Sequence, residues 1–185
     1  MMRILKRADL IDVPWKNGGG ITRNIASLMD KDDIVWRLSM ADVATPGPFS
    51  SFAGLTRILT VIEGNGMKLH SDGEVWPADF AVPVTFDGAA PVVATLDDGP
   101  ICDFNLMFDP TRYAATAHCV THKGAHNLGT LGQTAILHII QGNVTLVKSD
   151  DRLGAGDTAM CATAPIAYEL GEDACVLVTT LSPLS

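Results

Sequence analysis

The side chains best suited to binding or catalysis are three arginines and one aspartate, all in segments whose composition is typical of β-strands. Arg23, Arg37 and Arg57 lie in stretches with short apolar runs, and Asp103 lies in the similar stretch 102–107. A guanidinium presents a rigid fork of donors that matches a carboxylate, so a set of arginines around one pocket would bind an acidic molecule. A lone arginine more often pairs with an internal carboxylate, for which Asp103 is the natural partner.

Two of these stretches alternate between apolar and polar residues. In the stretch 36–40, Arg37 and Ser39 fall on one face, and in the stretch 102–107 Asp103 and Asn105 share a face. Inside a barrel each polar group must find a partner, because an unpaired buried group costs about 1–3 kcal/mol. We expect one shared cavity walled by Trp15 or Trp36, in which Arg37 pairs with Asp103. Its polar lining is predicted to be Arg37, Ser39, Arg57, Asp103 and Asn105.

The most unusual segment of the sequence is Trp15-Lys16-Asn17-Gly18-Gly19-Gly20. Three consecutive glycines are costly to order unless the backbone approaches something closely or adopts positive φ. No Lys-Ser or Lys-Thr follows the glycines, so a phosphate loop is not indicated. Two interpretations stay open: a backbone nest beside a pocket, or a strained turn.

Metal and nucleophile signatures are weak. The chain has five histidines without a His-x-His pair, and the spacing of His118, His122 and His126 is interrupted by Gly124. We interpret that trio as a loop or surface cluster rather than a metal site. No Ser-His-Asp or Cys-His nucleophile pattern is visible. The sequence therefore predicts no metal and no cofactor, and it favours a non-enzyme.

The elements that would position these residues are short strands. The 17 glycines and 10 prolines punctuate runs of Val, Ile, Thr and Leu, which is typical of many strands joined by turns. The one helical candidate is the segment 109–115, where Asp109 could cap and Pro110 could take the first helical position.

An internal repeat indicates duplication. The segment 58–65 reads ILTVIEGN and the segment 136–143 reads ILHIIQGN, identical at five of eight positions. Each copy is a buried strand, a Gly-Asn turn and a second strand, which together form a hairpin. Reuse of this hairpin favours two jelly-roll or cupin barrels over an immunoglobulin sandwich. We expect an all-β double cupin with halves 1–108 and 109–185.

Composition excludes several classes of partner. The formal net charge of −8 opposes binding to nucleic acid, and no run of about 18 apolar residues could span a membrane. The basic start is not followed by an apolar stretch of signal-peptide length. The four scattered cysteines are typical of reduced thiols. We therefore expect a cytoplasmic protein with no nucleic-acid or membrane partner.

Four ordered motifs in the first half resemble the HutD/Ves family. They are Pro14-Trp15-Lys16-Asn17-Gly18-Gly19-Gly20-x-Thr22-Arg23, Trp36-Arg37-x-Ser39-x-Ala41, Gly47-Pro48-Phe49-Ser50-x-Phe52-x-Gly54-x-x-Arg57 and Asp103-Phe104-Asn105-Leu106-Met107. The resemblance implies a bicupin fold and a link to histidine utilisation that is regulatory rather than catalytic. Family members usually carry Glu after Thr-Arg, where this chain has Asn24, so one carboxylate is missing from the expected pocket edge.

Three hypotheses follow for function. The first is a regulatory or metabolite-buffering protein that binds a small acidic metabolite such as formylglutamate or urocanate. A homodimer is compatible with this hypothesis. The second is a metal-independent isomerase or hydrolase that uses Asp103 as acid or base. The third is an interaction protein with a vestigial pocket. The candidate binding residues are Trp15, Asn17, Arg23, Trp36, Arg37, Ser39, Arg57, Asp103 and Asn105.

Overall fold

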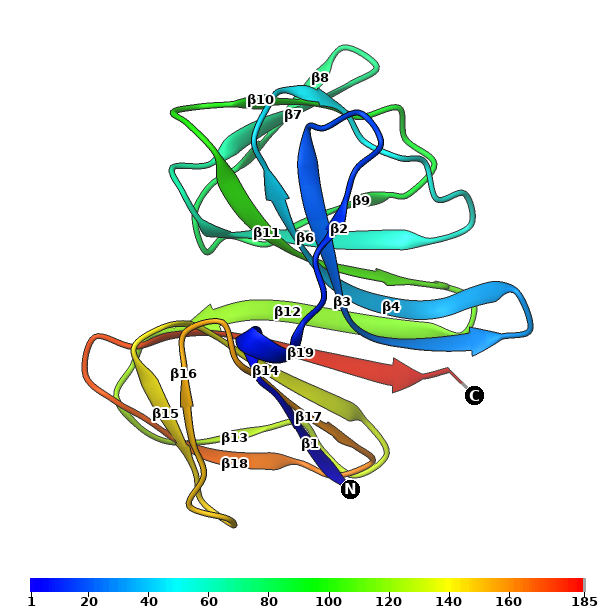
Figure 1. Ribbon diagram of the computed structural model, residues 1–185. Helices are drawn as coiled ribbons and strands as arrows, with labels where there is room; N and C mark the ends of the chain where they lie inside the picture. Colours follow the sequence, from blue (N-terminus) through cyan, green and yellow to red (C-terminus); the bar gives the residue numbers. More distant parts are fainter. Residues whose placement is uncertain (185) are drawn as a thin grey trace. The chain divides into compact units, whose positions relative to one another are not determined.

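The computed structural model describes residues 1–184, and its regular secondary structure consists of antiparallel strands and one short 3₁₀ turn (Figure 1). The chain divides into two compact units: Ile11–Thr111, called here the N-terminal barrel, and Met1–Leu10 together with the chain from Arg112 onward, called the C-terminal barrel. Among the described residues, no helix is long and apolar enough to cross a membrane.

The N-terminal barrel contains two facing sheets. The larger has the order β2-β3-β4-β11-β6-β9 and the smaller has the order β5-β10-β7-β8. The strands are β2 (Val13–Pro14), β3 (Gly20–Asp30), β4 (Asp33–Val43), β5 (Gly47–Pro48), β6 (Thr56–Glu63), β7 (Met67–Ser71), β8 (Glu74–Ala78), β9 (Val84–Asp87), β10 (Val93–Leu96) and β11 (Ile101–Phe108). Apolar side chains such as Leu59, Val61 and Leu69 fill the space between the sheets.

The C-terminal barrel repeats this plan. Its sheets have the orders β1-β17-β14-β19-β12 and β13-β18-β15-β16. The elements are β1 (Met2–Leu5), the 3₁₀ turn η1 (Arg7–Asp9), β12 (Tyr113–Val120), β13 (Gly124–Leu128), β14 (Thr134–Gln141), β15 (Asn143–Leu146), β16 (Arg152–Gly154), β17 (Thr158–Ala162), β18 (Ile166–Leu170) and β19 (Cys175–Pro183). Leu137, Ile139 and Leu146 lie in its core, at the places that Leu59, Val61 and Leu69 take in the first barrel.

The pairing registers confirm the duplication predicted from the repeat. The order β4-β11-β6-β9 matches β12-β19-β14-β17, and β5-β10-β7-β8 matches β13-β18-β15-β16. Both barrels also share one irregularity: the pairing of β11 with β6 and the pairing of β19 with β14 each skip one residue just before the Gly-Asn turn. A bulge at the same place in both halves supports duplication, because bulges are specific local features.

The glycine that ends each repeated strand is required in both barrels. Gly64 and Gly142 have φ angles of +92° and +74°. A Cβ atom on Gly142 would lie 2.7 Å from Cα of Ala174, and one on Gly64 would lie 2.6 Å from the backbone oxygen of Pro100. Only glycine fits such a close approach of neighbouring backbone atoms at positive φ, which explains why the sequence repeat predicts the turn.

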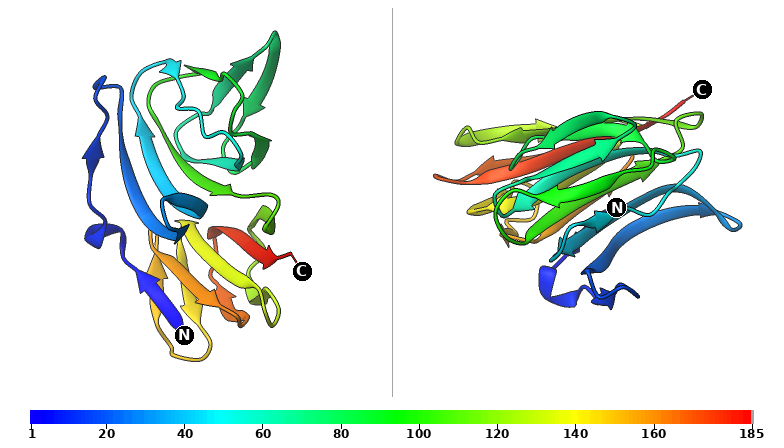
Figure 2. Two further views of the ribbon diagram at one scale, coloured as in Figure 1. Left: turned by 90° about the vertical axis from the view of Figure 1, so that its right-hand side faces the viewer. Right: turned by 90° about the horizontal axis from the view of Figure 1, so that it is seen from above.

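Two expectations need correction. The segment Met1–Leu10 belongs with the C-terminal barrel rather than with residues 11–108, because β1 pairs with β17 (Figures 1 and 2). The predicted helix over 109–115 is wrong, since Tyr113 already begins β12. Asp109 Oδ1 accepts hydrogen bonds from the Thr111 backbone N–H at 2.8 Å and from its hydroxyl at 2.7 Å, so the aspartate caps a tight turn instead of a helix.

Besides the pairing of β1 with β17, one carboxylate holds the segment Met1–Leu10 within its barrel. Asp157 accepts hydrogen bonds from Lys6 Nζ at 2.8 Å, the Arg7 backbone N–H at 3.1 Å and the Gly154 backbone N–H at 3.0 Å. These contacts hold the pKa of Asp157 below its usual range, although burial opposes them.

Candidate functional site

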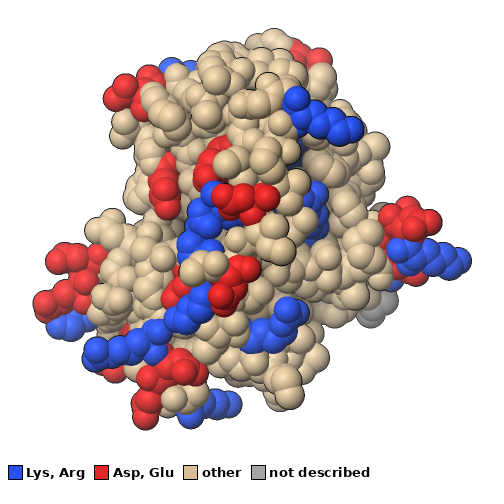
Figure 3. Space-filling model, viewed as in Figure 1, with Lys and Arg blue, Asp and Glu red and all other residues tan. Residues whose placement is uncertain are grey.

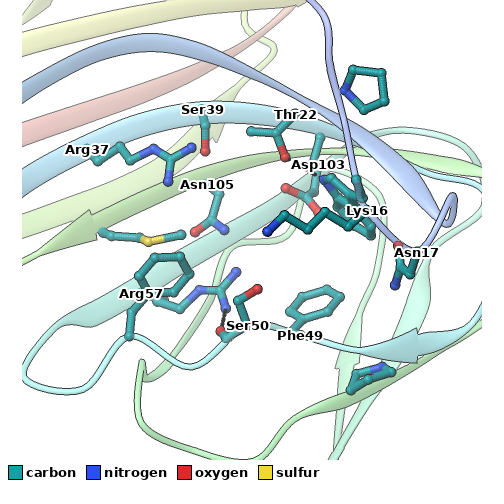
Figure 4. Close-up of a pocket in the computed structure, with 16 residues that line it drawn as sticks. Lys16, Asn17, Thr22, Arg37, Ser39, Phe49, Ser50, Arg57, Asp103 and Asn105 are labelled. Atoms are coloured by element: carbon teal, nitrogen blue, oxygen red, sulfur yellow. Dashed lines mark hydrogen bonds between the residues drawn. The ribbon is translucent and has the colours of Figure 1, made fainter.

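A cavity of about 500 Å³ lies in the N-terminal barrel, within the range of small-molecule sites. Side chains of β3, β4, β6 and β11 form one side, the segment after β5 forms another, and the turn before β3 closes the edge. Figure 4 shows Arg37, Ser39, Asp103 and Asn105 directed toward the same space as Arg57, and Lys16 reaching in from the side.

The polar lining follows from strand register. Pairing places Arg37 of β4 beside Met107 of β11, which in turn lies beside Arg57 of β6. The next row on the same face holds Ser39 and Asn105. The row after that holds Thr22, Ala41 and Asp103. Alternate residues of adjacent strands therefore build one polar surface, as the period of two requires.

Seven of the nine candidate residues line this cavity. They are Trp15, Asn17, Arg37, Ser39, Arg57, Asp103 and Asn105. Trp36 does not, because it alternates with Arg37 and is buried on the opposite face of β4. Arg23 also lies on that opposite face, where it forms ion pairs with Asp12 and with Asp42, the latter at 2.7 Å.

The predicted pairing of Arg37 with Asp103 is wrong. Arg37 Nε donates to Asn24 Oδ1 at 2.7 Å instead. Asn24 is the residue that replaces the glutamate expected from the family pattern, so the Arg37 charge is tethered by a neutral amide. The guanidinium therefore keeps its full positive charge for another anion.

Arg57 is held by aromatic rings. Its Cζ atom lies 5.2 Å from the ring centre of Phe49, 5.7 Å from that of Phe52 and 5.0 Å from that of Phe86. Each ring face attracts the cation and helps to replace lost water. Its Nη1 donates to the Ser50 backbone oxygen at 3.4 Å, while Nε is buried without a partner. Burial lowers the pKa of Arg57 to about 10, well above neutrality, so the group remains a cation.

Two acceptors in the cavity also lack partners. Asp103 is 2% exposed and Asn105 is 5% exposed, and Oδ1 of each is buried without a hydrogen bond. Buried polar groups of folded proteins are nearly always satisfied, so this donor and these two acceptors are available to hydrogen-bond to molecules inside the cavity. The neighbouring Cys102 offers no thiolate nucleophile, because burial raises its pKa.

The glycine-rich turn positions a wall rather than an anion. Trp15 Nε1 donates to Thr22 Oγ1 at 2.7 Å, which fixes the indole against β3. The Gly18 and Gly19 N–H groups donate to the Trp15 backbone oxygen and to Asn17 Oδ1, both at 3.0 Å, so neither is free for an anion. A Cβ atom on Gly20 would lie 2.3 Å from the Asp42 backbone oxygen, so the close approach of the turn to β4 requires glycine.

The candidate list missed Lys16, Thr22, Phe49, Ser50, Phe52 and Met107, which also line the cavity. Phe49, Ser50 and Phe52 stand in the third motif, so their signal was present. Their contribution depends on the segment after β5 folding over Arg57, which alternation along a single strand does not reveal.

The C-terminal barrel has a second cavity, of about 340 Å³, at the equivalent place. Register makes Val176 the counterpart of Asp103, Val178 that of Asn105 and Ala135 that of Arg57. Similarly, β12 carries Thr116 and His118 where β4 carries Arg37 and Ser39. Among the described residues, no Lys, Arg, Asp or Glu lines this second cavity.

The histidine trio is not a metal cluster in the part of the chain that the structure describes. His118 and His126 lie on β12 and β13, and His122 lies in the loop between them. His126 stacks on Tyr168 with ring centres 5.3 Å apart, and its Nε2 lies 2.6 Å from the His122 backbone oxygen.

Comparison with known proteins places this architecture in a family. The sequence model of the HutD family matches residues 7–178. The chain belongs to the HutD family. A 21.2 kDa protein in the hutC 3′ region of Pseudomonas putida is 43% identical over 119 residues, which are 62% of each chain. Protein Ves of Citrobacter koseri is 31% identical over 150 residues, 80% of this chain and 75% of that one.

A solved HutD structure shares the whole fold. HutD from Pseudomonas fluorescens SBW25, solved in a formate condition, is 32% identical over the full length of both chains with a TM-score of 0.87. The fold expected from the repeat, an all-β double cupin, is confirmed. The aligned part of the chain spans less than two thirds of the Pseudomonas putida relative.

Proposed function

We propose that this HutD-family chain binds a small carboxylate metabolite in the cavity of the N-terminal barrel. In this proposal it acts in the cytoplasm as a regulatory or metabolite-buffering protein of histidine utilisation, with formylglutamate or urocanate as the candidate ligands. The link to that pathway is supported by relatives named HutD and hutC-region protein.

The observation that carries the proposal is the charge balance of the cavity. Lys16, Arg37 and Arg57 line it, and Asp103 is the one acidic side chain among the described residues of the lining. A cationic cavity in a chain with a net charge of −8 is a local exception, since on the face in Figure 3 most basic side chains lie among acidic ones. An acidic ligand would supply both the missing anion for Arg57 Nε and the counter-charge for Arg37.

Thermal unfolding with added metabolite tests the proposal. Formylglutamate, urocanate and formate are each titrated against the wild type, the double variant Arg37→Ala/Arg57→Ala and the surface control Arg3→Ala. A ligand at 100 times its Kd adds about 2.7 kcal/mol of stability, which raises the melting temperature. We expect the shift in the wild type and the Arg3→Ala control, and none in the double variant. An equal shift in the double variant would eliminate the carboxylate pocket.

A second function is favoured by one observation. Burial raises the pKa of Asp103 to about 7, which suits a general acid or base near neutral pH. A metal-independent isomerase or hydrolase would use this group, and turnover of formylglutamate or urocanate followed by NMR tests it. Turnover that Asp103→Asn abolishes would favour the enzyme over the binding protein.

A further inference from the structure

Asp103 is an unusual carboxyl group because no donor stabilises its negative charge. It lies on β11 among the side chains that line the cavity, and Oδ1 has no partner. The neighbouring polar side chain on the same face, Asn105, directs its own unpartnered Oδ1 into the same region. A buried carboxylate without donors is costly, whereas the protonated acid carries its own donor.

The charged neighbours of Asp103 come from every element packed around it. Arg57 of β6 is the main favourable charge, but its guanidinium is engaged with three phenylalanine rings and the Ser50 backbone oxygen. Arg37 of β4 is tethered to Asn24 of β3, and Lys16 approaches from the turn before β3.

The remaining neighbours are acidic or neutral. Asp42 of β4 adds an unfavourable negative charge, and Cys102 carries a neutral thiol. No histidine lines the cavity among the described residues. Burial is the largest influence on Asp103, Arg57 opposes it and Asp42 reinforces it, and together they raise the pKa of Asp103 to about 7. Asp103 is therefore the group in the cavity that changes its charge near neutral pH.

We propose that Asp103 receives the acidic ligand as the neutral acid, so that a carboxylate bound beside Arg57 requires a proton on Asp103, and the protein takes that proton up from solvent wherever the unliganded carboxyl group is ionised. This inference rests on the proposed function of the cavity. An ionised Asp103 would repel the incoming anion in a site of low dielectric constant. A protonated Asp103 instead donates its O–H to a ligand oxygen, while Arg57 Nε donates to the same carboxylate.

The proton comes from solvent and resides on the Asp103 carboxyl group while the ligand is bound. Binding and protonation are thereby linked: the ligand selects the protonated form of the protein. With an apo midpoint of about 7, the apparent Kd should rise about tenfold between pH 6 and pH 8, because the competent fraction falls by that factor.

Isothermal titration calorimetry with formylglutamate tests this inference, because its two carboxylates stay ionised between pH 6 and pH 8. Titrations at pH 6, 7 and 8 are run in two buffers of different ionisation enthalpy, which gives the protons taken up per ligand. We expect little uptake at pH 6 and close to one proton at pH 8. This measurement uses the wild type and needs no variant.

The matched variant is Asp103→Asn, whose amide can donate to the ligand but cannot titrate. We expect it to bind formylglutamate with an affinity that changes less than twofold from pH 6 to pH 8. Binding by the wild type without proton uptake at pH 8, or with proton release at any pH, would overturn this inference and leave the proposed function standing. Failure of formylglutamate, urocanate and formate to bind at every pH would overturn both.

Discussion

Replacing Asp103 by asparagine should make the unliganded protein more stable at pH 8. The side chain is buried, has an unpartnered oxygen and has a pKa of about 7 in the folded state, whereas an aspartate in the unfolded chain has a pKa of about 3.9. Because the folded pKa is raised, the unfolded chain loses its proton first as the pH rises. The folded state is therefore progressively destabilised between about pH 4 and pH 7, and the penalty levels off above that.

The magnitude follows from linkage. Between pH 5 and pH 8, a group with these two pKa values costs the folded state on the order of 2–3 kcal/mol. The free energy of unfolding of the wild type should fall by that amount relative to Asp103→Asn over the same interval. The higher stability of Asp103→Asn at pH 8 is the opposite of what would be expected if Asp103 and Arg57 formed a stabilising ion pair.

The assay is urea denaturation of both proteins at pH 5 and pH 8, with Asp151→Asn as a control. Asp151 is exposed and bonds to Ser149 Oγ at 2.6 Å, so its replacement should shift stability by only a few tenths of a kcal/mol at both pH values. A variant Asp103→Asn that is less stable than the wild type at pH 8 would refute the reasoning, since Arg57 and Asp103 would then form a net favourable pair.

Three further predictions concern the scaffold and metal content. Gly142→Ala should lower the free energy of unfolding by more than about 1 kcal/mol, since its new Cβ would lie 2.7 Å from Cα of Ala174. The control Gly132→Ala, also at positive φ but with open space around the Cβ, should cost less in the same chemical denaturation series. Asp157→Ala should cost about 1–3 kcal/mol at pH 7, because Lys6 and two backbone N–H groups lose their acceptor. Because the folded pKa of Asp157 is depressed, the difference in free energy of unfolding between the wild type and Asp157→Ala should disappear as the pH falls below about 4. A difference that stays constant over that pH range would contradict the stabilising role of the ionised Asp157. The purified protein should contain no stoichiometric transition metal and keep its melting temperature in a chelator, and elemental analysis that finds about one zinc, iron or manganese per chain would contradict this.

Much of the fold was predictable because a glycine turn marks the end of the strand in each copy of the repeat. Steric contacts require glycine at positions 64 and 142, so both halves have the Gly-Asn turn and the sequence repeat reveals it. The first ten residues were assigned to the wrong half because the pairing of β1 with β17 joins segments about 155 residues apart. No local pattern in the sequence reports such a contact.

The candidate site was predictable where alternation decides it. The rows that contain Arg37, Ser39, Asp103 and Asn105 follow from a period of two and antiparallel pairing. The same rule excludes Trp36, which sits next to Arg37 and must face the other way. The partner of Arg37 could not be predicted, because Asn24 reaches it only through the pairing of β3 with β4.

The bulge that both barrels share has a consequence for how this protein could be engineered. The C-terminal barrel keeps the same strand order and the same skipped residue, but Val176, Val178 and Ala135 stand where the first barrel has Asp103, Asn105 and Arg57, and only Val178 of these lines its cavity. Transplanting Asp and Arg to the positions of Val176 and Ala135 would therefore place charged groups in an apolar core, because both residues are fully buried. The two barrels thus share an architecture and differ in the side chains that their equivalent strands carry.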